Sequence, residues 1–247
     1  MKKFIALFVL LSLASCGASD SCFKSTGAVT SKAVDVSQTP FTKISVFTGI
    51  ALVVKEGPDY EITIRSGENI IDDVEVKIDN GMLTLKDDSG CNLMRSYGQT
   101  KVFVTAPNIE EIYSNTEKDI TSDGVLHYPI LRLFSMDFFG GVGTGDFHVE
   151  VDNGQLVIES NHVAGFYVTG HTNQMLLNFY DGIGRFEGEN LLADEIKVFH
   201  RGSNDMIVHP VQTLSGNMYS TGNIICKSQP ATVDVIEHWS GRVIFDN

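Results

Sequence analysis

Three charged residues in the C-terminal third of the chain, Asp181, Arg201 and Asp205, have types that could cleave a sugar chain. Glycosidic bonds are cleaved by paired carboxylates that act as acid and base or as nucleophile. Charged residues also come together by chance on neighbouring repeats of a protein. We therefore expect no catalytic residue here, and expect Asp181 and Arg201 to form a surface ion pair that contributes little to stability.

The histidines do not indicate a metal site. They show neither the HExxH spacing of a zinc hydrolase nor a nearby CxxC pair, so we expect no metal and no cofactor. The seven histidines are His127, His148, His162, His171, His200, His209 and His238.

Aromatic residues recur at a fixed spacing and suggest a binding surface. The glycines Gly182, Gly202, Gly222 and Gly241 are 20, 20 and 19 residues apart. Three positions before them stand Phe179, Phe199, Tyr219 and His238, and four positions after them stand Phe186, Met206, Cys226 and Phe245. A period near 20 without helical periodicity predicts a β-solenoid, in which matched side chains stack from coil to coil.

The column four places after each glycine is apolar in every coil, so we expect it to form the core. If the column of rings before the glycines also points inward, the next position faces solvent and presents Tyr180, His200, Ser220 and Trp239. Flat rings suit the apolar faces of sugars, so the candidate ligand-binding residues are Tyr180, His200, Trp239, Asp181 and Arg201. The alternative is that Trp239 covers the open end of the solenoid and Tyr180 packs on a loop.

Short alternating strands precede the repeats. Asp79-Asn80-Gly81 separates two of them and predicts a β-hairpin. The glycine-rich run from Gly140 to Gly145 lacks the strand-to-helix context of a phosphate-binding loop, so we expect a turn between strands.

The N-terminus has the pattern of an exported lipoprotein. Lys2 and Lys3 precede an apolar run, and Leu13-Ala14-Ser15-Cys16 forms a lipobox, which predicts a signal peptide at 1–15 and lipidation at Cys16. A flexible tether should cover 16–36. One β-helix domain should follow at 37–247, with irregular strands at 37–107 and repeat coils at 108–247. We expect an envelope location, on the periplasmic or the outer face of the outer membrane.

Charge and cysteine usage add two expectations. Without Lys2 and Lys3 the 18 basic residues become 16 against 31 acidic ones, a net charge of −15, which disfavours nucleic acid as a partner. Cys226 should be buried as a small apolar residue. Cys22 and Cys91 either form a disulfide that pins the tether or remain free thiols.

The N-terminal strands resemble a known family. The residues that carry the resemblance are Phe41-x-x-Ile44, Gly49-Ile50, Gly57, Glu68-Asn69-Ile70, Gly81-x-Leu83-x-Leu85 and Val102-x-Val104-x-Ala106-Pro107-x-Ile109-x-x-Ile112. This pattern is similar to the auto-transporter adhesin head GIN domain family, common on lipoproteins of Bacteroidetes. The resemblance implies an all-β, right-handed parallel β-helix with about 20 residues per coil. It brings no catalytic residues.

Two functions from different classes remain open. The first is a non-catalytic envelope lipoprotein for adhesion or glycan binding, and the second is a β-helix carbohydrate-active enzyme of the lyase or hydrolase type. Binding of lipid or another envelope component is a third possibility with no sequence feature of its own.

Overall fold

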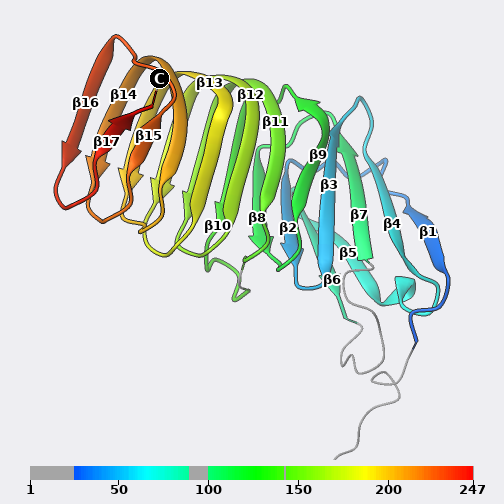
Figure 1. Cartoon of the computed structure of the whole chain (residues 1–247). Coiled ribbons are helices and arrows are strands. Elements are labelled where there is room, and N and C mark those ends of the chain that lie inside the picture. Colours follow the sequence, from blue (N-terminus) through cyan, green and yellow to red (C-terminus); the bar gives the residue numbers. More distant parts are fainter. Residues whose placement is uncertain (1–24, 89–99, 142, 247) are drawn as a thin grey trace, which may run out of the picture.

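The computed structural model describes residues 25–88, 100–141 and 143–246. It is nearly all β, with 63% strand and 1% helix, and forms a β-solenoid of about six turns with roughly 21 residues per coil (Figure 1). The predicted fold class is therefore confirmed. The expected signal peptide, Cys16, Cys22 and Cys91 lie outside the described residues.

The elements follow one another in a single parallel array with a few antiparallel additions near the N-terminus. They are β1 (Val29–Val34), β2 (Lys43–Phe47), β3 (Ile50–Glu56), β4 (Glu61–Gly67), η2 (Ile71–Asp73), β5 (Val74–Asp79), β6 (Met82–Asp87), β7 (Thr100–Ala106), β8 (Glu111–Asn115), β9 (Ile120–Leu126), β10 (Ile130–Ser135), β11 (Phe147–Ser160), β12 (Gly165–Phe179), β13 (Arg185–His200), β14 (Met206–Met218), β15 (Ile224–Cys226), β16 (Thr232–Glu237) and β17 (Val243–Phe245).

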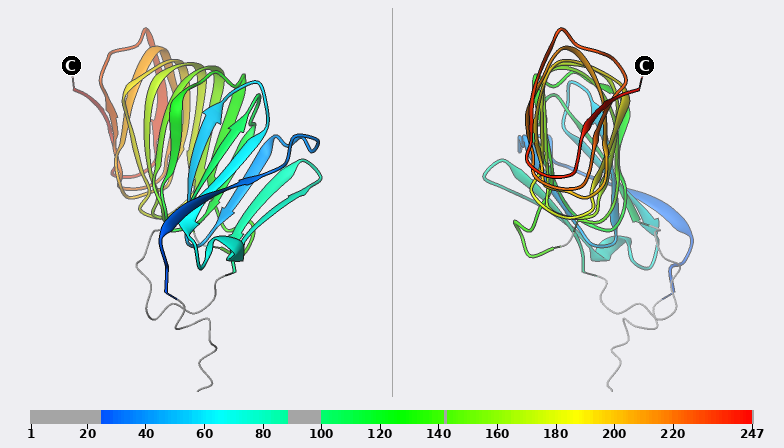
Figure 2. Two further views of the ribbon diagram at one scale, coloured as in Figure 1. Left: turned by 90° about the vertical axis from the view of Figure 1, so that its right-hand side faces the viewer. Right: turned by 60° about the vertical axis from the view of Figure 1, so that its left-hand side comes forward.

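The coils are flattened and have two long sides (Figure 2). Side A contains β3, β7, β9, the first halves of β11 to β14, β15 and β17. Side B contains β2, β6, β8, β10, the second halves of β11 to β14 and β16. We call the edge where side B strands end and turn into side A the lower edge, as it lies in Figure 1. The described turns of this edge are 48–49, 116–119, 136–141 with 143–146, 161–164, 180–184, 201–205, 219–223 and 238–242.

The N-terminal part departs from the parallel pattern. β5 and β6 form the predicted hairpin, whose turn places Asn80 at φ 49° and Gly81 at φ 76°. β4 pairs antiparallel with β7 and then with β1, from Val29 opposite Gly67 to Val34 opposite Ile62. β1 lies inside the segment expected to be a flexible tether. The folded domain therefore begins before residue 37.

The core consists of side-chain columns that continue through successive coils. One column runs through Phe147, Phe166, Phe186, Met206 and Ile224, all fully buried, and its first two rings stack at 4.8 Å. Such stacking makes each coil depend on its neighbours.

The predicted core column is correct in burial for three of its four members but wrong in register. Phe186, Met206 and Cys226 are buried, whereas Phe245 in the last coil is 36% exposed. Cys226 does not lie on Met206 but pairs with Val208. The cause is an irregular corner between side A and side B. β13 has more residues between Glu187 and Leu192 than β14 has between Ile207 and His209, the residues that pair with them. Counting from the glycines therefore loses register by two residues.

The glycine-rich run from Gly140 to Gly145 belongs to the turn between β10 and β11. A Cβ on Gly143 would lie 2.2 Å from the Ser114 carbonyl oxygen, and one on Gly145 would lie 2.0 Å from that of Lys118. The backbone of this turn therefore lies directly on the preceding coil, where a side chain would not fit.

Candidate ligand-binding face

The predicted stripe of Tyr180, His200, Ser220 and Trp239 does not exist as one surface. His200 is fully buried, in the core column that contains Phe179 and Met218. A register shift between Tyr167 and Gly170 places His200, not Phe199, beside Phe179. A slip of one residue turns a side chain to the opposite face of a strand, so His200 points inward and Phe199 outward.

A different aromatic ladder crosses four coils on the outside of side B. Tyr180 contacts Phe199 with ring centroids 5.6 Å apart, and Phe199 contacts Tyr219 at 5.3 Å. Tyr219 stacks on His238 at 4.3 Å and an interplanar angle of 2°. Three of these rings were recognised in the sequence as a repeated column but were assigned to the interior. We call Tyr180, Phe199, Tyr219 and His238 the aromatic ladder.

The Tyr180 hydroxyl lies close to the Glu159 carboxylate. Burial and this carboxylate raise the pKa of Tyr180 above its ordinary value. The phenol therefore remains a hydrogen-bond donor across the physiological pH range.

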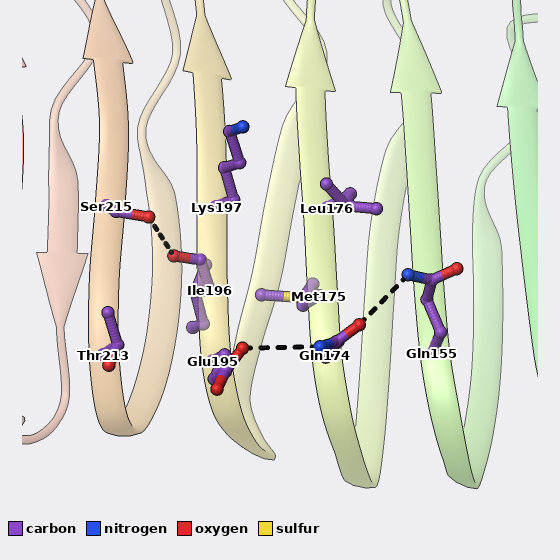
Figure 3. Close-up of a pocket in the computed structure, with 9 residues that line it drawn as sticks. All are labelled: Gln155, Gln174, Met175, Leu176, Glu195, Ile196, Lys197, Thr213 and Ser215. Carbon is purple, nitrogen blue, oxygen red and sulfur yellow. Dashed lines mark hydrogen bonds between the residues drawn. The ribbon is translucent and has the colours of Figure 1, made fainter.

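A polar ladder runs beside the rings at the start of the same strands. The Gln155 amide donates to Gln174 at 3.3 Å, and the Gln174 amide donates to Glu195 at 3.4 Å (Figure 3). Thr213 continues this column on the next coil. Leu176, Lys197 and Ser215 line the same shallow hollow. Side B therefore presents amide, carboxylate, hydroxyl and ammonium groups at the start of its strands and the aromatic ladder at their ends.

The candidate catalytic residues Asp181 and Asp205 accept hydrogen bonds within the turns of the lower edge. Asp205 Oδ1 accepts hydrogen bonds from the backbone and the side-chain amide of Asn223, both at 2.9 Å, and so joins two successive turns. Asp181 accepts from the Gly182 backbone at 2.7 Å, and in the described residues no ion pair joins it to Arg201. The predicted ion pair is therefore wrong.

The bonds of Asp205 belong to a repeated device at the lower edge. Asp146 likewise accepts from the Gly165 backbone at 2.7 Å, and Asn223 accepts from that of Arg242 at 3.1 Å. These bonds tie each of these turns of the lower edge to the next coil. Nothing in this arrangement resembles a pair of carboxylates on either side of a bound sugar.

Trp239 directly follows His238, the last member of the aromatic ladder, and a second group of rings lies in earlier coils. Trp239 is 68% exposed, in the turn after β16. Near the middle of the molecule Tyr113 stacks on Phe134 at 4.6 Å, and Phe138 and Phe139 contact the Tyr113 ring edge-on.

Within the described ranges, no group of three or more His, Cys, Asp and Glu side chains could hold a metal ion. In the same ranges, none of the helical structure is long and apolar enough to span a bilayer.

A solenoid with one ring-bearing and polar side is a repeat scaffold that presents an extended surface to a ligand. The family model described as "Putative auto-transporter adhesin, head GIN domain" matches residues 40–230. The chain belongs to this family, which confirms the resemblance seen in the sequence.

Solved structures share the fold. A putative adhesin from Bacteroides fragilis is 18% identical, with a TM-score of 0.79 over 90% of this chain and 99% of that one. A protein from Parabacteroides distasonis named a putative lipid binding protein is 14% identical, with a TM-score of 0.63 over 89% and 98%. A putative adhesin from Parabacteroides merdae is 15% identical, with a TM-score of 0.62 over 91% and 100%. No curated protein matches the sequence.

Proposed function

We propose that this protein is a cell-envelope lipoprotein, anchored by acylation of Cys16, whose solenoid binds an extended saccharide without cleaving it. The observation that carries the proposal is the aromatic ladder beside the Gln155–Gln174–Glu195 ladder on one side of the molecule. Membership of a family described as adhesins, and relatives named as adhesins, support a binding role at the cell surface or in the envelope.

The geometry of side B suits a polymer that crosses the coils. The rings follow one another at 4.3 to 5.6 Å and form a continuous apolar strip that a polymer along the axis could contact coil by coil. The polar ladder offers hydrogen-bond donors and acceptors at a similar repeat, about 4.8 Å between coils. The two ladders lie at opposite ends of the side B strands, four residues apart from Glu195 to Phe199, or about 13 Å. A saccharide along the solenoid axis would contact the rings, and a branch or a second chain would reach the amides and Glu195.

The competing enzyme function requires residues that are free to react. Asp205 is committed to the Asn223 backbone and amide, and Asp181 to the Gly182 backbone. Relatives named as adhesins or as a lipid binding protein also favour a non-catalytic role. We therefore assign the protein to binding rather than to polysaccharide cleavage.

The test uses a panel of polysaccharides and a glycan array with the wild-type domain and two variants. Phe199→Ala removes the central ring of the ladder. Tyr167→Ala removes an exposed ring from side A, where it stacks on His148, and is the control. Binding that is lost in Phe199→Ala and kept in Tyr167→Ala, with no new reducing ends, supports the proposal. Equal loss in both variants contradicts the site, and released products would establish an enzyme.

A further inference from the structure

The lower edge carries large apolar side chains that the fold leaves uncovered. Phe138 and Phe139 are 52% and 46% exposed on the turn between β10 and β11. Val163, Ile183 and Trp239 are similarly or more exposed on later turns of the same edge. We call these five residues the apolar rim. Exposed apolar groups gathered along one edge of a soluble domain indicate a contact surface.

The two phenylalanines at the centre of the rim are held in place. Asp137, next to Phe138, contacts the His162 ring at 2.6 Å and accepts a hydrogen bond from the Asn161 amide at 3.3 Å. The Tyr113 ring supports both phenylalanines from behind, with centroids 5.9 and 5.2 Å away. These contacts fix the turn on the next coil and keep both rings directed outward, which lowers the entropy that any binding event would lose.

The opposite edge is different. In the described turns between side A and side B, the exposed large apolar side chains are Leu192 and Val211, with Ile130 just inside β10. None of them is aromatic, and their neighbours Glu189, Asn190 and Gln212 are polar and exposed. The rim is therefore a property of one edge and not of solenoid corners in general.

The N-terminal segment leaves the domain at this same edge. Val29 pairs with Gly67 at the lower end of β4, and Ser25 accepts a hydrogen bond from the Asn69 side chain at 3.1 Å. The first described residues lie at the bottom of the coils in Figures 1 and 2, on the side of the turn that carries Phe138. Eight residues separate Ser25 from Cys16, and the nine Cα–Cα steps between them reach at most about 30 Å. An acyl chain at Cys16 would therefore hold the apolar rim close to a bilayer.

The charge of the edge selects the kind of lipid. In the turns of this edge that the structure describes, six acidic residues stand against the basic residues Lys118, Arg201 and Arg242; the acidic ones are Glu117, Asp119, Asp137, Asp146, Asp181 and Asp205. Such an edge is repelled by anionic headgroups, so its attraction to a membrane must come from burial of apolar groups.

We propose that the apolar rim rests on the surface of a zwitterionic lipid bilayer, with the rings of Phe138, Phe139 and Trp239 at headgroup depth. The solenoid then lies with its axis along the membrane, and side B stands upright with its ladders facing sideways. This contact goes beyond saccharide binding and uses different residues. Because lipidation of Cys16 is itself a proposal, the test leaves it out.

The test uses the chain from Gly17 onward, which has no acyl chain and contains every described strand, from Val29 to Phe245. It is mixed with phosphatidylcholine vesicles and sedimented. Trp239 is the single tryptophan of the sequence and reports its own environment by fluorescence. We expect saturable binding at about 1 mM lipid or below, with a blue shift of Trp239 emission and quenching by brominated phosphatidylcholine.

Two double variants locate the contact. Phe138→Ser with Phe139→Ser should reduce the partition coefficient roughly tenfold or more, because two large rings no longer leave water. Leu192→Ser with Val211→Ser removes two apolar side chains from the opposite edge and should leave binding unchanged. If the first pair lowers the thermal midpoint, Val163→Ser with Ile183→Ser tests the same edge without touching the Tyr113 cluster.

Three outcomes overturn the proposal. They are failure of the wild-type chain to bind the vesicles, equal loss in both pairs, and a bound protein whose Trp239 is not quenched. Stronger binding to phosphatidylglycerol vesicles than to phosphatidylcholine would also contradict it, because it would indicate attraction by charge. None of these results bears on the glycan array, so failure of the membrane contact is distinguishable from failure of saccharide binding.

Discussion

Acidification should destabilise the solenoid through one side chain, His200. Its ring is fully buried. Burial lowers the pKa of His200 from 6.5 to about 4, and this outweighs the opposing effects of the Asn204 backbone and the Asp205 carboxylate. The imidazole is therefore neutral in the folded protein at neutral pH.

The sign of the effect follows from the two pKa values. In the unfolded chain the histidine titrates near 6.5, so on acidification the unfolded state takes up a proton that the folded state rejects. The contribution to stability is complete above pH 6.5, falls between pH 6.5 and 4, and changes no further below about pH 4. A gap of about 2.5 pH units corresponds to about 3 kcal/mol in total, of which about 2.5 kcal/mol is lost by pH 4.5.

Urea unfolding at pH 7.5 and pH 4.5 measures this loss. His200→Met is the matched variant, because Met218 fills the equivalent place on the next coil. Carboxylates titrate in both proteins, so the difference between them isolates the imidazole. We expect the free energy of unfolding of the wild type to fall by about 2.5 kcal/mol more than that of the variant. The same fall in both proteins would refute the assignment of a neutral, buried His200.

Four further predictions follow from residues described above. Phe199→Ala should weaken saccharide binding in titration calorimetry about tenfold or more and change the thermal midpoint little, because the ring is only half-buried; unchanged affinity would remove it from the site. Gly222→Ala should lower the free energy of unfolding by about 3 kcal/mol in denaturant, because its Cβ would lie 2.2 Å from the Asn204 carbonyl oxygen. At Gly202 a Cβ would have no atom closer than 3.4 Å, so Gly202→Ala should lose less than about 1 kcal/mol. The Cys226 thiol, buried and with its pKa raised to about 11, should react with iodoacetamide only after denaturation, and rapid native labelling would contradict its burial. Cys16→Ala should abolish labelling by a fatty-acid analogue, and persistent label would place the lipid elsewhere.

The architecture could be predicted from the sequence because every coil of a solenoid needs similar residue types at similar places. The spacing of Gly182, Gly202, Gly222 and Gly241 and the apolar residues after them predict the coils, and Asn80-Gly81 predicts the hairpin. The family resemblance agrees with both. β1 could not be foreseen, because Val29–Val34 is exposed and lacks the alternation of apolar residues that marks a half-buried strand.

The candidate site could be predicted only in part, because strand faces depend on register. Tyr180 lies on the ligand face and Trp239 is exposed, but His200 is in the core. One additional residue in β13 near the corner reverses the faces of Phe199 and His200, and the glycine spacing does not reveal it. The polar ladder had a signal that was missed, since Gln155, Gln174 and Glu195 recur at intervals of 19 and 21 residues.

The antiparallel pairing of β1 with β4 has a mechanical consequence. A protein that is held by its N-terminus at a membrane and by its coils on a saccharide is under tension when cell and ligand separate. The pull on Val29 is directed along β1 and away from the lower edge, so all six residue pairs from Val29–Gly67 to Val34–Ile62 resist together in shear. The hydrogen bonds lie across the strands and cannot open one after another under such a load. With the proposed anchor and saccharide site, β1 would bear this load before it reached the stacked coils.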